Sequence, residues 1–172
     1  MWYVIQTRAG NEQKMTLECE KHTHENEEVF YPLIRYEKRI RGKNIEVTKS
    51  MFPGYIFFDT EDVDGLFFRL KKVFGLTKIL KTGDFFTPIS EEEENMINEL
   101  AGDDHLVEIS EGLKEDGRVR ITSGPLKDFS GVIKHIDRRR RTATLEVMML
   151  GEIREVKVGL RVMNPEGEDG ED

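Results

Sequence analysis

The sequence predicts an α+β unit, with one antiparallel sheet and flanking helices, followed by a small all-β barrel. The chain has 172 residues, and its 37% hydrophobic content suits two small cores better than one large core. Helical and strand-like patterns alternate before residue 102, whereas only short strand-like segments and tight turns follow residue 117. Charge divides in the same way. Residues 1–111 hold 14 basic and 22 acidic side chains, and residues 112–164 hold 12 and 7. Such asymmetry indicates separate units with separate partners.

The first unit begins with an aromatic and β-branched segment at 2–7, which predicts a strand. Residues 11–24 lack Gly and Pro and place Met15 and Cys19 one helical turn apart, so we expect a mostly exposed helix. A long strand is predicted over Val29–Ile40, which a turn joins to a return strand at 45–48 as a β-hairpin.

The second half of this unit starts at a sharp turn, Phe52-Pro53-Gly54-Tyr55, which leads into a buried strand ending at Phe58. Apolar residues at helical spacing predict a helix over 62–74, and a strand is expected at 77–81. Ser90 and Glu93 form a capping box that begins an acidic helix running through Leu100. We expect this α+β unit to span residues 1–106.

A short linker is predicted over 107–116, followed by the barrel over 117–164. Short strands at 118–122, 130–137, 142–150 and 153–158 favour a closed barrel of the SH3-like type. The tail, 165–172, carries five acids and no base, and we expect it to be disordered.

Several classes of protein are excluded by composition. No apolar run exceeds five residues, so no segment spans a bilayer, and the N-terminus lacks the pattern of a secretion signal. A single cysteine, Cys19, permits no internal disulfide and suits a reducing cytosol. We therefore expect a cytoplasmic protein, and a monomer.

Catalysis is not indicated, because the sequence contains no nucleophile elbow, phosphate-binding loop or dinucleotide fingerprint. The carboxylates of Glu91–Glu94 suit a solvated first helical turn. Cys19 and His22 share a helical face, but His24 points away and no second ligand pair follows. We expect neither a metal nor a cofactor.

Four consecutive arginines, Arg138–Arg141, fall between two predicted strands and should form a hairpin tip from which all four side chains leave the surface. A solvated turn is the simpler interpretation, but mutual repulsion of the four charges favours a polyanionic partner. Arginine also suits bidentate contacts to phosphate or guanine. Further cations in the same unit are Arg118, Arg120, Lys127, Lys134, His135 and Arg154.

Both faces of the strand after Gly54 are apolar, since Tyr55 and Phe57 share one face while Ile56 and Phe58 share the other. The strand is either central and covered on both faces, or it leaves an aromatic face open for another protein. The residues alone leave these two interpretations even.

Three segments of the chain resemble the NusG family of transcription elongation factors. The opening Trp2-Tyr3-Val4 and the segment Ser50–Phe57 are similar to its N-terminal NGN domain. The stretch from Gly117 to Ile133, which contains Ser123-Gly124-Pro125, is similar to its KOW motif. The resemblance runs over nearly the whole chain in the family's order.

The resemblance implies that the NGN domain docks on the clamp helices of RNA polymerase through an aromatic pocket. Phe52, Tyr55 and Phe57 occupy the positions of that pocket. It further implies contact with the non-template DNA strand, for which the candidates are Arg8, Lys14, Lys71 and Lys72. A processivity factor that suppresses pausing or termination, rather than an enzyme, is the implied activity.

Two segments differ from the housekeeping pattern of the family. Glu37–Lys43 resembles the specialised paralogues RfaH and LoaP, and Leu150–Ile153 replaces the segment that helps housekeeping members bind a small-subunit ribosomal protein. The basic β-hairpin of the KOW unit resembles LoaP, which implies an antiterminator that binds a hairpin in the nascent leader RNA. The candidate RNA contacts are Arg118, Arg120, Lys127, Lys134, Arg138–Arg141 and Arg154. The alternatives are a housekeeping NusG that couples transcription to translation, or a KOW-type RNA-binding module without polymerase affinity.

Overall fold

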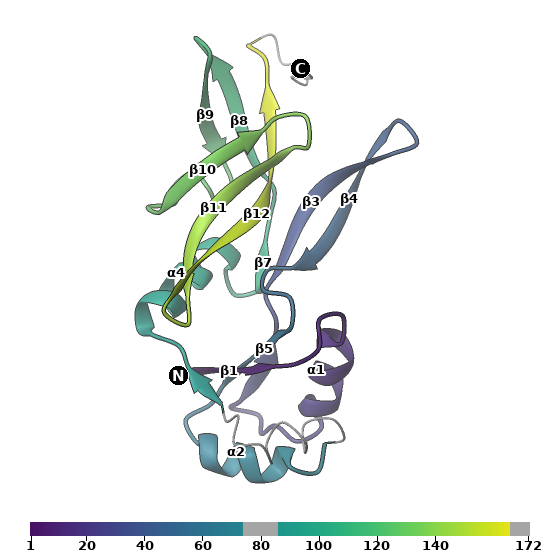
Figure 1. Ribbon diagram of the computed structural model, residues 1–172, viewed down its shortest axis with the longest axis vertical. Helices are drawn as coiled ribbons and strands as arrows, with labels where there is room; N and C mark the ends of the chain where they lie inside the picture. The colour runs from purple at the N-terminus through teal and green to yellow at the C-terminus, as the bar shows by residue number, and fades with distance from the viewer. Residues whose placement is uncertain (74–85, 166–172) are drawn as a thin grey trace. The chain divides into compact units, whose positions relative to one another are not determined.

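The computed structural model describes residues 1–73 and 86–165, and the chain forms two compact units (Figure 1). Unit 1 comprises Met1–Tyr31 and Phe52–Glu94, whereas unit 2 comprises Pro32–Met51 and the chain from Asn95 onward. The predicted strand at 77–81 and nearly all of the predicted acidic tail lie outside the described residues. The domain boundary predicted at residue 106 stays a prediction.

Unit 1 is built on a four-stranded antiparallel sheet in the order β2-β5-β1-β6. Its two central strands are β1 (Trp2–Gln6) and β5 (Tyr55–Asp59), and its edges are β2 (Glu28–Phe30) and β6 (Thr87–Pro88). Val4 lies opposite Phe57 in the β1–β5 register. The strand after Gly54 is therefore central in its sheet, as one of the two interpretations left open by the sequence requires.

Helices α1 (Glu12–Glu20) and α2 (Val63–Leu70) supply apolar side chains to one core with this sheet. Ile56 and Phe58 of β5 both belong to that core, as their shared face predicted. The core also contains Ile5, Met15, Cys19, Val29, Leu66 and Leu70. Asp62 caps α2 by accepting a hydrogen bond from the Gly65 amide at 3.0 Å.

The long strand predicted over Val29–Ile40 is wrong, because the chain divides it into β2 and β3 (Leu33–Ile40), which belong to different sheets. Pro32 separates them, and proline cannot donate the hydrogen bond that a continuous ladder needs. The amide of Leu33 instead bonds the carbonyl of His105 at 2.9 Å.

In unit 2, β3 pairs with β4 (Lys43–Ser50) as the predicted hairpin. Its tight turn places Arg41 at φ 52° and Gly42 at φ 77°, both in the left-handed region that such two-residue turns require. The short β7 (Leu106–Val107) adds to β3 in parallel, so a three-stranded sheet forms in the order β4-β3-β7.

The helix α4 (Glu91–Ala101) begins at the predicted capping box. The Ser90 amide donates to Glu93 Oε1 at 3.0 Å, and the Glu93 amide donates to Ser90 Oγ at 3.1 Å. These reciprocal bonds satisfy amides that the first helical turn leaves without partners.

A five-stranded sheet of unit 2 curls in the order β10-β11-β12-β8-β9, consistent with the predicted small barrel (Figure 1). The strands are β8 (Ser110–Glu115), β9 (Arg118–Ser123), β10 (Val132–Asp137), β11 (Thr142–Met149) and β12 (Glu152–Met163). The interval 107–116 was expected as a linker, but most of it forms β8. The long β12 pairs antiparallel with β11 and then, over its last four residues, parallel with β8.

Gly159 marks the place where β12 passes close to β3 within unit 2. A Cβ atom at this position would lie 2.6 Å from the Arg35 carbonyl oxygen and 3.1 Å from the Tyr36 Cα. Only a residue without a side chain therefore permits this backbone approach, which sets the β3–β4 hairpin beside the turn between β10 and β11.

Candidate nucleic-acid and protein-docking sites

The run Arg138–Arg141 forms the turn between β10 and β11, as predicted. Asp137 Oδ1 accepts a hydrogen bond from the Arg140 amide at 3.0 Å, and Arg141 adopts the left-handed region at φ 57°. The carbonyl of Arg141 then accepts from the Leu160 amide at 2.9 Å, which ties the turn to β12. The position of the four arginines is therefore fixed by backbone bonds.

The expectation that all four side chains leave the surface is wrong. Arg139 and Arg140 are exposed and Arg138 is half-buried, but the Arg141 side chain is only 11% exposed. Its Nη1 lies 3.1 Å from Oε2 of Glu37 on β3. A charge this well shielded is stabilised by its ion pair and does not need an external anion.

Glu37 also binds Arg161 of β12, which in turn bonds Glu46 Oε1 at 2.9 Å. Burial alone would lower the pKa of Arg161, but the hydrogen bonds that it donates to Glu37 and Glu46 raise it above its ordinary value. Arg161 is therefore a structural cation, and two carboxylates of the β3–β4 hairpin are engaged by the C-terminal sheet.

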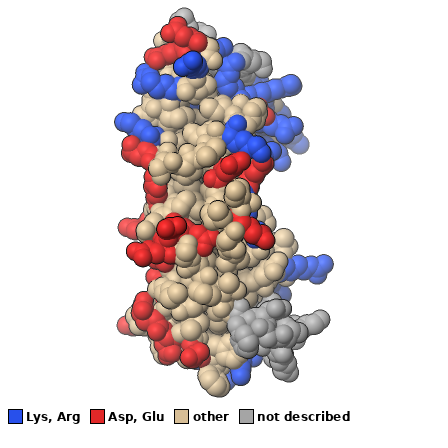
Figure 2. Space-filling model, turned by 60° about the vertical axis from the view of Figure 1, so that its left-hand side comes forward, with Lys and Arg blue, Asp and Glu red and all other residues tan. Residues whose placement is uncertain are grey.

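Three of the other predicted RNA-binding cations have acidic neighbours. Arg120 makes two hydrogen bonds of 3.1 Å to Glu115, and Lys134 pairs with Glu155. Arg154 lies 3.7 Å from Glu152. The predicted Arg118 and Lys127 are exposed, as is His135. Figure 2 shows Lys and Arg side chains gathered near the top of the view, where β8 to β10 lie, with acidic side chains among them.

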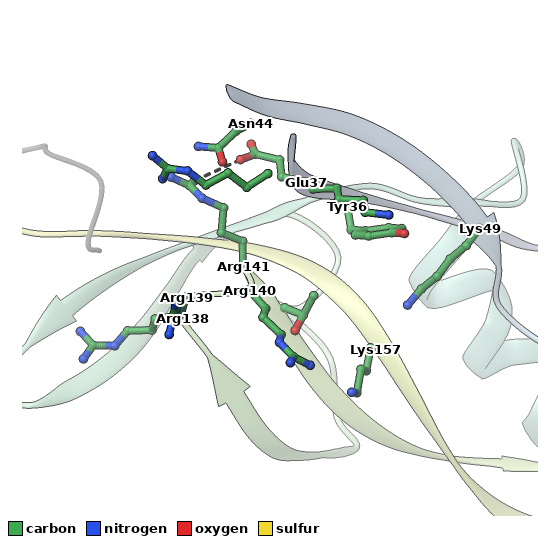
Figure 3. A pocket seen from close by; sticks show the side chains of 12 residues that line it. Tyr36, Glu37, Asn44, Lys49, Arg138, Arg139, Arg140, Arg141 and Lys157 are labelled. Atoms are coloured by element: carbon green, nitrogen blue, oxygen red, sulfur yellow. Dashed lines mark ion pairs between the residues drawn. The ribbon is translucent and has the colours of Figure 1, made fainter. Parts of the chain in front are cut away.

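A cleft of about 780 Å³ lies beside the arginine turn within unit 2 (Figure 3). One wall comes from the β3–β4 hairpin, which contributes Tyr36, Glu37, Lys38, Arg39, Asn44 and Lys49. The other wall comes from the turn, residues 138–142, and from Lys157 of β12. The hairpin residues were not among the predicted RNA contacts, because no sequence signal brings β3 and this turn together.

The predicted polymerase-docking residues of unit 1 lie on and beside β5. Phe57 is completely buried and Phe52 is 4% exposed. The Phe57 ring stacks on Phe30 at 5.5 Å between centroids and lies edge-on to Trp2 at 6.2 Å. Phe52 lies 6.0 Å from Phe57. These rings form an aromatic cluster, whereas Tyr55 is half-exposed and presents the accessible side chain of the three.

The predicted DNA contacts are all exposed in unit 1. Arg8 follows β1 and Lys14 lies on α1, while Lys71 and Lys72 follow α2. The ammonium of Lys71 lies over the rings of Phe67 and Phe68, at 4.7 and 4.8 Å from their centroids. Their exposure is compatible with binding a phosphate backbone.

Metal coordination is not supported at Cys19, His22 and His24. Cys19 is fully buried, and burial, followed by the charges of Glu18 and Glu20, raises the pKa of its thiol to about 12. Among residues 1–73 and 86–165, no group of three or more His, Cys, Asp or Glu side chains could hold a metal ion. No helix in the same ranges is long and apolar enough to cross a membrane.

The fold and these surfaces define a protein of two parts. An α+β part with an antiparallel sheet is followed by a small β-barrel that carries a basic turn. A family model described as "Transcription termination factor nusG" matches residues 1–98, and one described as "KOW motif" matches residues 115–148. The first match covers more than half of the chain. The chain belongs to the NusG family.

Curated relatives carry the name "Transcription termination/antitermination protein NusG". The protein from Halalkalibacterium halodurans is 29% identical over 161 residues, which cover 87% of this chain and 89% of the relative. That from Bacillus subtilis is 28% identical with the same coverage. That from Rickettsia typhi is 26% identical and is covered over 82% of its length.

Proposed function

We propose that this protein is a specialised, LoaP-like NusG factor that promotes transcription through terminators. It docks on the clamp helices of RNA polymerase through its NGN domain and binds a hairpin in the nascent leader RNA through its KOW domain. Holding the RNA raises the effective concentration of the NGN domain near polymerase. The docked NGN domain favours a closed clamp, so the elongating complex passes the terminator.

The observation that carries RNA binding is the turn between β10 and β11. Arg139 and Arg140 are exposed there, and the Arg140 guanidinium, 77% exposed, lies 3.9 Å from the Asp137 carboxylate. By contrast, Arg120 and Lys134 of the same sheet pair with the carboxylates of Glu115 and Glu155. The turn therefore concentrates positive charge at a fixed place, which is the footprint expected for a phosphate backbone.

Polymerase docking is supported by the family and by the arrangement around β5. Tyr55 follows the Phe52–Gly54 turn and begins β5, the strand whose Phe57 lies at the centre of the aromatic cluster with Trp2, Phe30 and Phe52. A half-exposed aromatic ring on a rigid support is typical of an interface anchor. Phe52 and Phe57 act in this proposal by supporting Tyr55. The non-template DNA strand would pass Arg8, Lys14, Lys71 and Lys72.

A purified transcription assay on a template with the leader and a terminator tests both parts. We expect Tyr55→Ala to abolish read-through and leave leader-RNA affinity unchanged, because the RNA contacts lie in the other unit. Phe68→Ala is the matched control, since Phe68 is an exposed aromatic residue on α2. Read-through that persists in Tyr55→Ala would remove the docking assignment.

A housekeeping role is the second candidate, and one structural observation favours it besides the names of the relatives. Met148 and Ile153 lie directly opposite each other on β11 and β12, and they are 46% and 67% exposed. An exposed apolar pair suits a protein partner such as a ribosomal protein. Two results would favour this role. The chain would co-sediment with small ribosomal subunits and lose this binding in Ile153→Ser, and read-through would not depend on the leader. A module without polymerase affinity would instead fail to retain core polymerase in a pulldown with the full chain.

A further inference from the structure

The cleft between the β3–β4 hairpin and the arginine turn is strongly cationic. Eight of its twelve lining residues are Lys or Arg, and one is acidic. The acid, Glu37, already pairs with Arg141 (Figure 3) and with Arg161, which lies outside the lining. Counted over its twelve lining residues, the cleft therefore carries more positive than negative charge, which suits an anionic ligand.

Two of these eight cations are lysines on opposite walls of the cleft. Lys49 of β4 and Lys157 of β12 both line it. Burial and then the charge of Lys157 lower the pKa of Lys49. An anion between the walls would relieve this repulsion, because it would lie close to both ammonium groups.

The uncharged lining residues suit a nucleotide rather than a simple anion. Tyr36 is half-buried and holds the Lys49 ammonium 4.8 Å from its ring centroid. A tyrosine ring beside phosphate-binding cations is the arrangement on which single-stranded bases stack. The side-chain amide of Asn44 can both donate and accept hydrogen bonds at a base edge.

The size of the cleft limits the form of the nucleic acid. About 780 Å³ is the volume of a site for a drug-sized ligand, which corresponds to a nucleotide or two. A double helix does not fit into such a volume, whereas the backbone of a single strand can pass through it. Gly159 and the Glu37 ion pairs hold the two walls in place.

We propose that this cleft binds single-stranded RNA, and that the β3–β4 hairpin supplies one half of the site through Tyr36, Lys38, Arg39 and Lys49. This inference rests on the proposed function: the KOW domain holds the leader hairpin, and the cleft takes the single strand that adjoins it. Single-stranded DNA offers the same phosphates and bases, so the experiment includes both.

The test measures binding of fluorescent oligouridylate and oligothymidylate, each of about ten nucleotides, to the full chain over a salt series. We expect Lys38→Ala/Arg39→Ala to weaken oligouridylate binding about tenfold and to reduce the salt slope by about 1.4, since two phosphate contacts are lost. The matched control is Arg41→Ala/Lys43→Ala, which removes the same charge from the same hairpin outside the cleft. We expect this control to stay within about twofold of the unmodified chain.

Three results would overturn the inference. They are no oligouridylate binding by the unmodified chain, an equal loss in the two double variants, and oligothymidylate binding as tight as oligouridylate binding.

A leader-hairpin probe distinguishes failure of the inference from failure of the proposed function. If the chain binds that hairpin but not oligouridylate, only the inference fails. If it binds oligouridylate through the cleft but not the hairpin, the leader-recruitment mechanism fails and the cleft stands. Unchanged circular dichroism spectra establish that the variants are folded.

Discussion

Arg141 Nη1 lies 3.1 Å from Glu37 Oε2, and the two side chains are only 11% and 6% exposed. The pair joins the last residue of the arginine turn to the middle of β3. The arginines of the turn therefore differ in their surroundings. Arg141 holds the turn against the hairpin, while the Arg139 and Arg140 side chains are exposed to solvent.

The replacement Glu37→Gln should destabilise the protein by on the order of 3 kcal/mol, because it removes the carboxylate charge beside the shielded Arg141 and one of the carboxylates that bind Arg161. Urea unfolding measures this change. The control Glu155→Gln removes an exposed partner of Lys134 and should change the stability far less, because solvent screens this pair. Similar losses in the two variants would show that the Glu37 pairs are no stronger than surface pairs.

Local patterns predicted much of the fold. Aromatic and β-branched residues predicted β1, helical spacing predicted α1 and α2, and the Ser90–Glu93 capping box located the start of α4. The arginine turn was also found, because strand-like residues flank it. In each case the signal lies within a few residues of the structure that it predicts.

The errors arise where distant segments decide the structure. The strand β8 was missed because Ser110–Glu115 has little strand-like pattern, and its pairing with β9 and β12 is a tertiary effect. The burial of Arg141 depends on Glu37, more than a hundred residues earlier in the chain. The wall that Tyr36 and Lys49 give to the cleft was hidden for the same reason.

Glu27 should make stability depend on acid pH. Burial alone would raise the pKa of this carboxyl, but Arg69, Thr60 Oγ1 and the His24 amide lower it from 4.5 to about 2. The folded state therefore binds the proton more weakly than the unfolded state. The resulting stability, on the order of 3 kcal/mol, is complete above about pH 5 and is lost as the pH falls toward 2.

The Glu27→Gln variant tests this contribution in urea unfolding at several pH values. Its stability should fall less steeply than that of the unmodified chain between about pH 5 and 2. Glu18→Gln, which removes an exposed partner of Lys21, should keep the original slope. Parallel curves for Glu27→Gln and the unmodified chain would contradict the assignment.

Gly54 shapes the turn that presents Tyr55. Its φ is 86°, and an added Cβ would lie 3.0 Å from the Thr7 carbonyl oxygen. Its amide also donates to Glu12 Oε1 at 2.7 Å. Gly54→Ala should therefore cost more than the roughly 1–2 kcal/mol expected from the left-handed conformation alone. Gly10→Ala isolates that conformational part, since Gly10 has φ 96° and nothing within 4 Å of its Cβ position. Equal thermal-unfolding losses in the two variants would disprove the steric contribution.

Cys19 should be inert in the folded protein. Its side chain is fully buried and its pKa is raised to about 12, so little thiolate forms at neutral pH. A thiol-reactive dye should label the native chain only at the rate of unfolding, and should label one site per chain at once in urea. Rapid native labelling would show that the packing of α1 opens readily.

The two exposed arginines of the turn should account for the salt dependence of leader-RNA binding. Phosphates are their expected ligands, because the major groove of A-form RNA is too narrow for side chains to read. Each lost contact should reduce the salt slope by about 0.7–0.9, so Arg139→Ala/Arg140→Ala should flatten it by about 1.5 and weaken binding strongly.

The unfolding midpoint of this double variant should not change, since both side chains are solvated. Arg141→Ala should behave differently, with lower stability because Glu37 loses a shielded partner. If the double variant binds leader RNA with unchanged affinity and slope, the turn is not an RNA contact and the recruitment mechanism loses its main support.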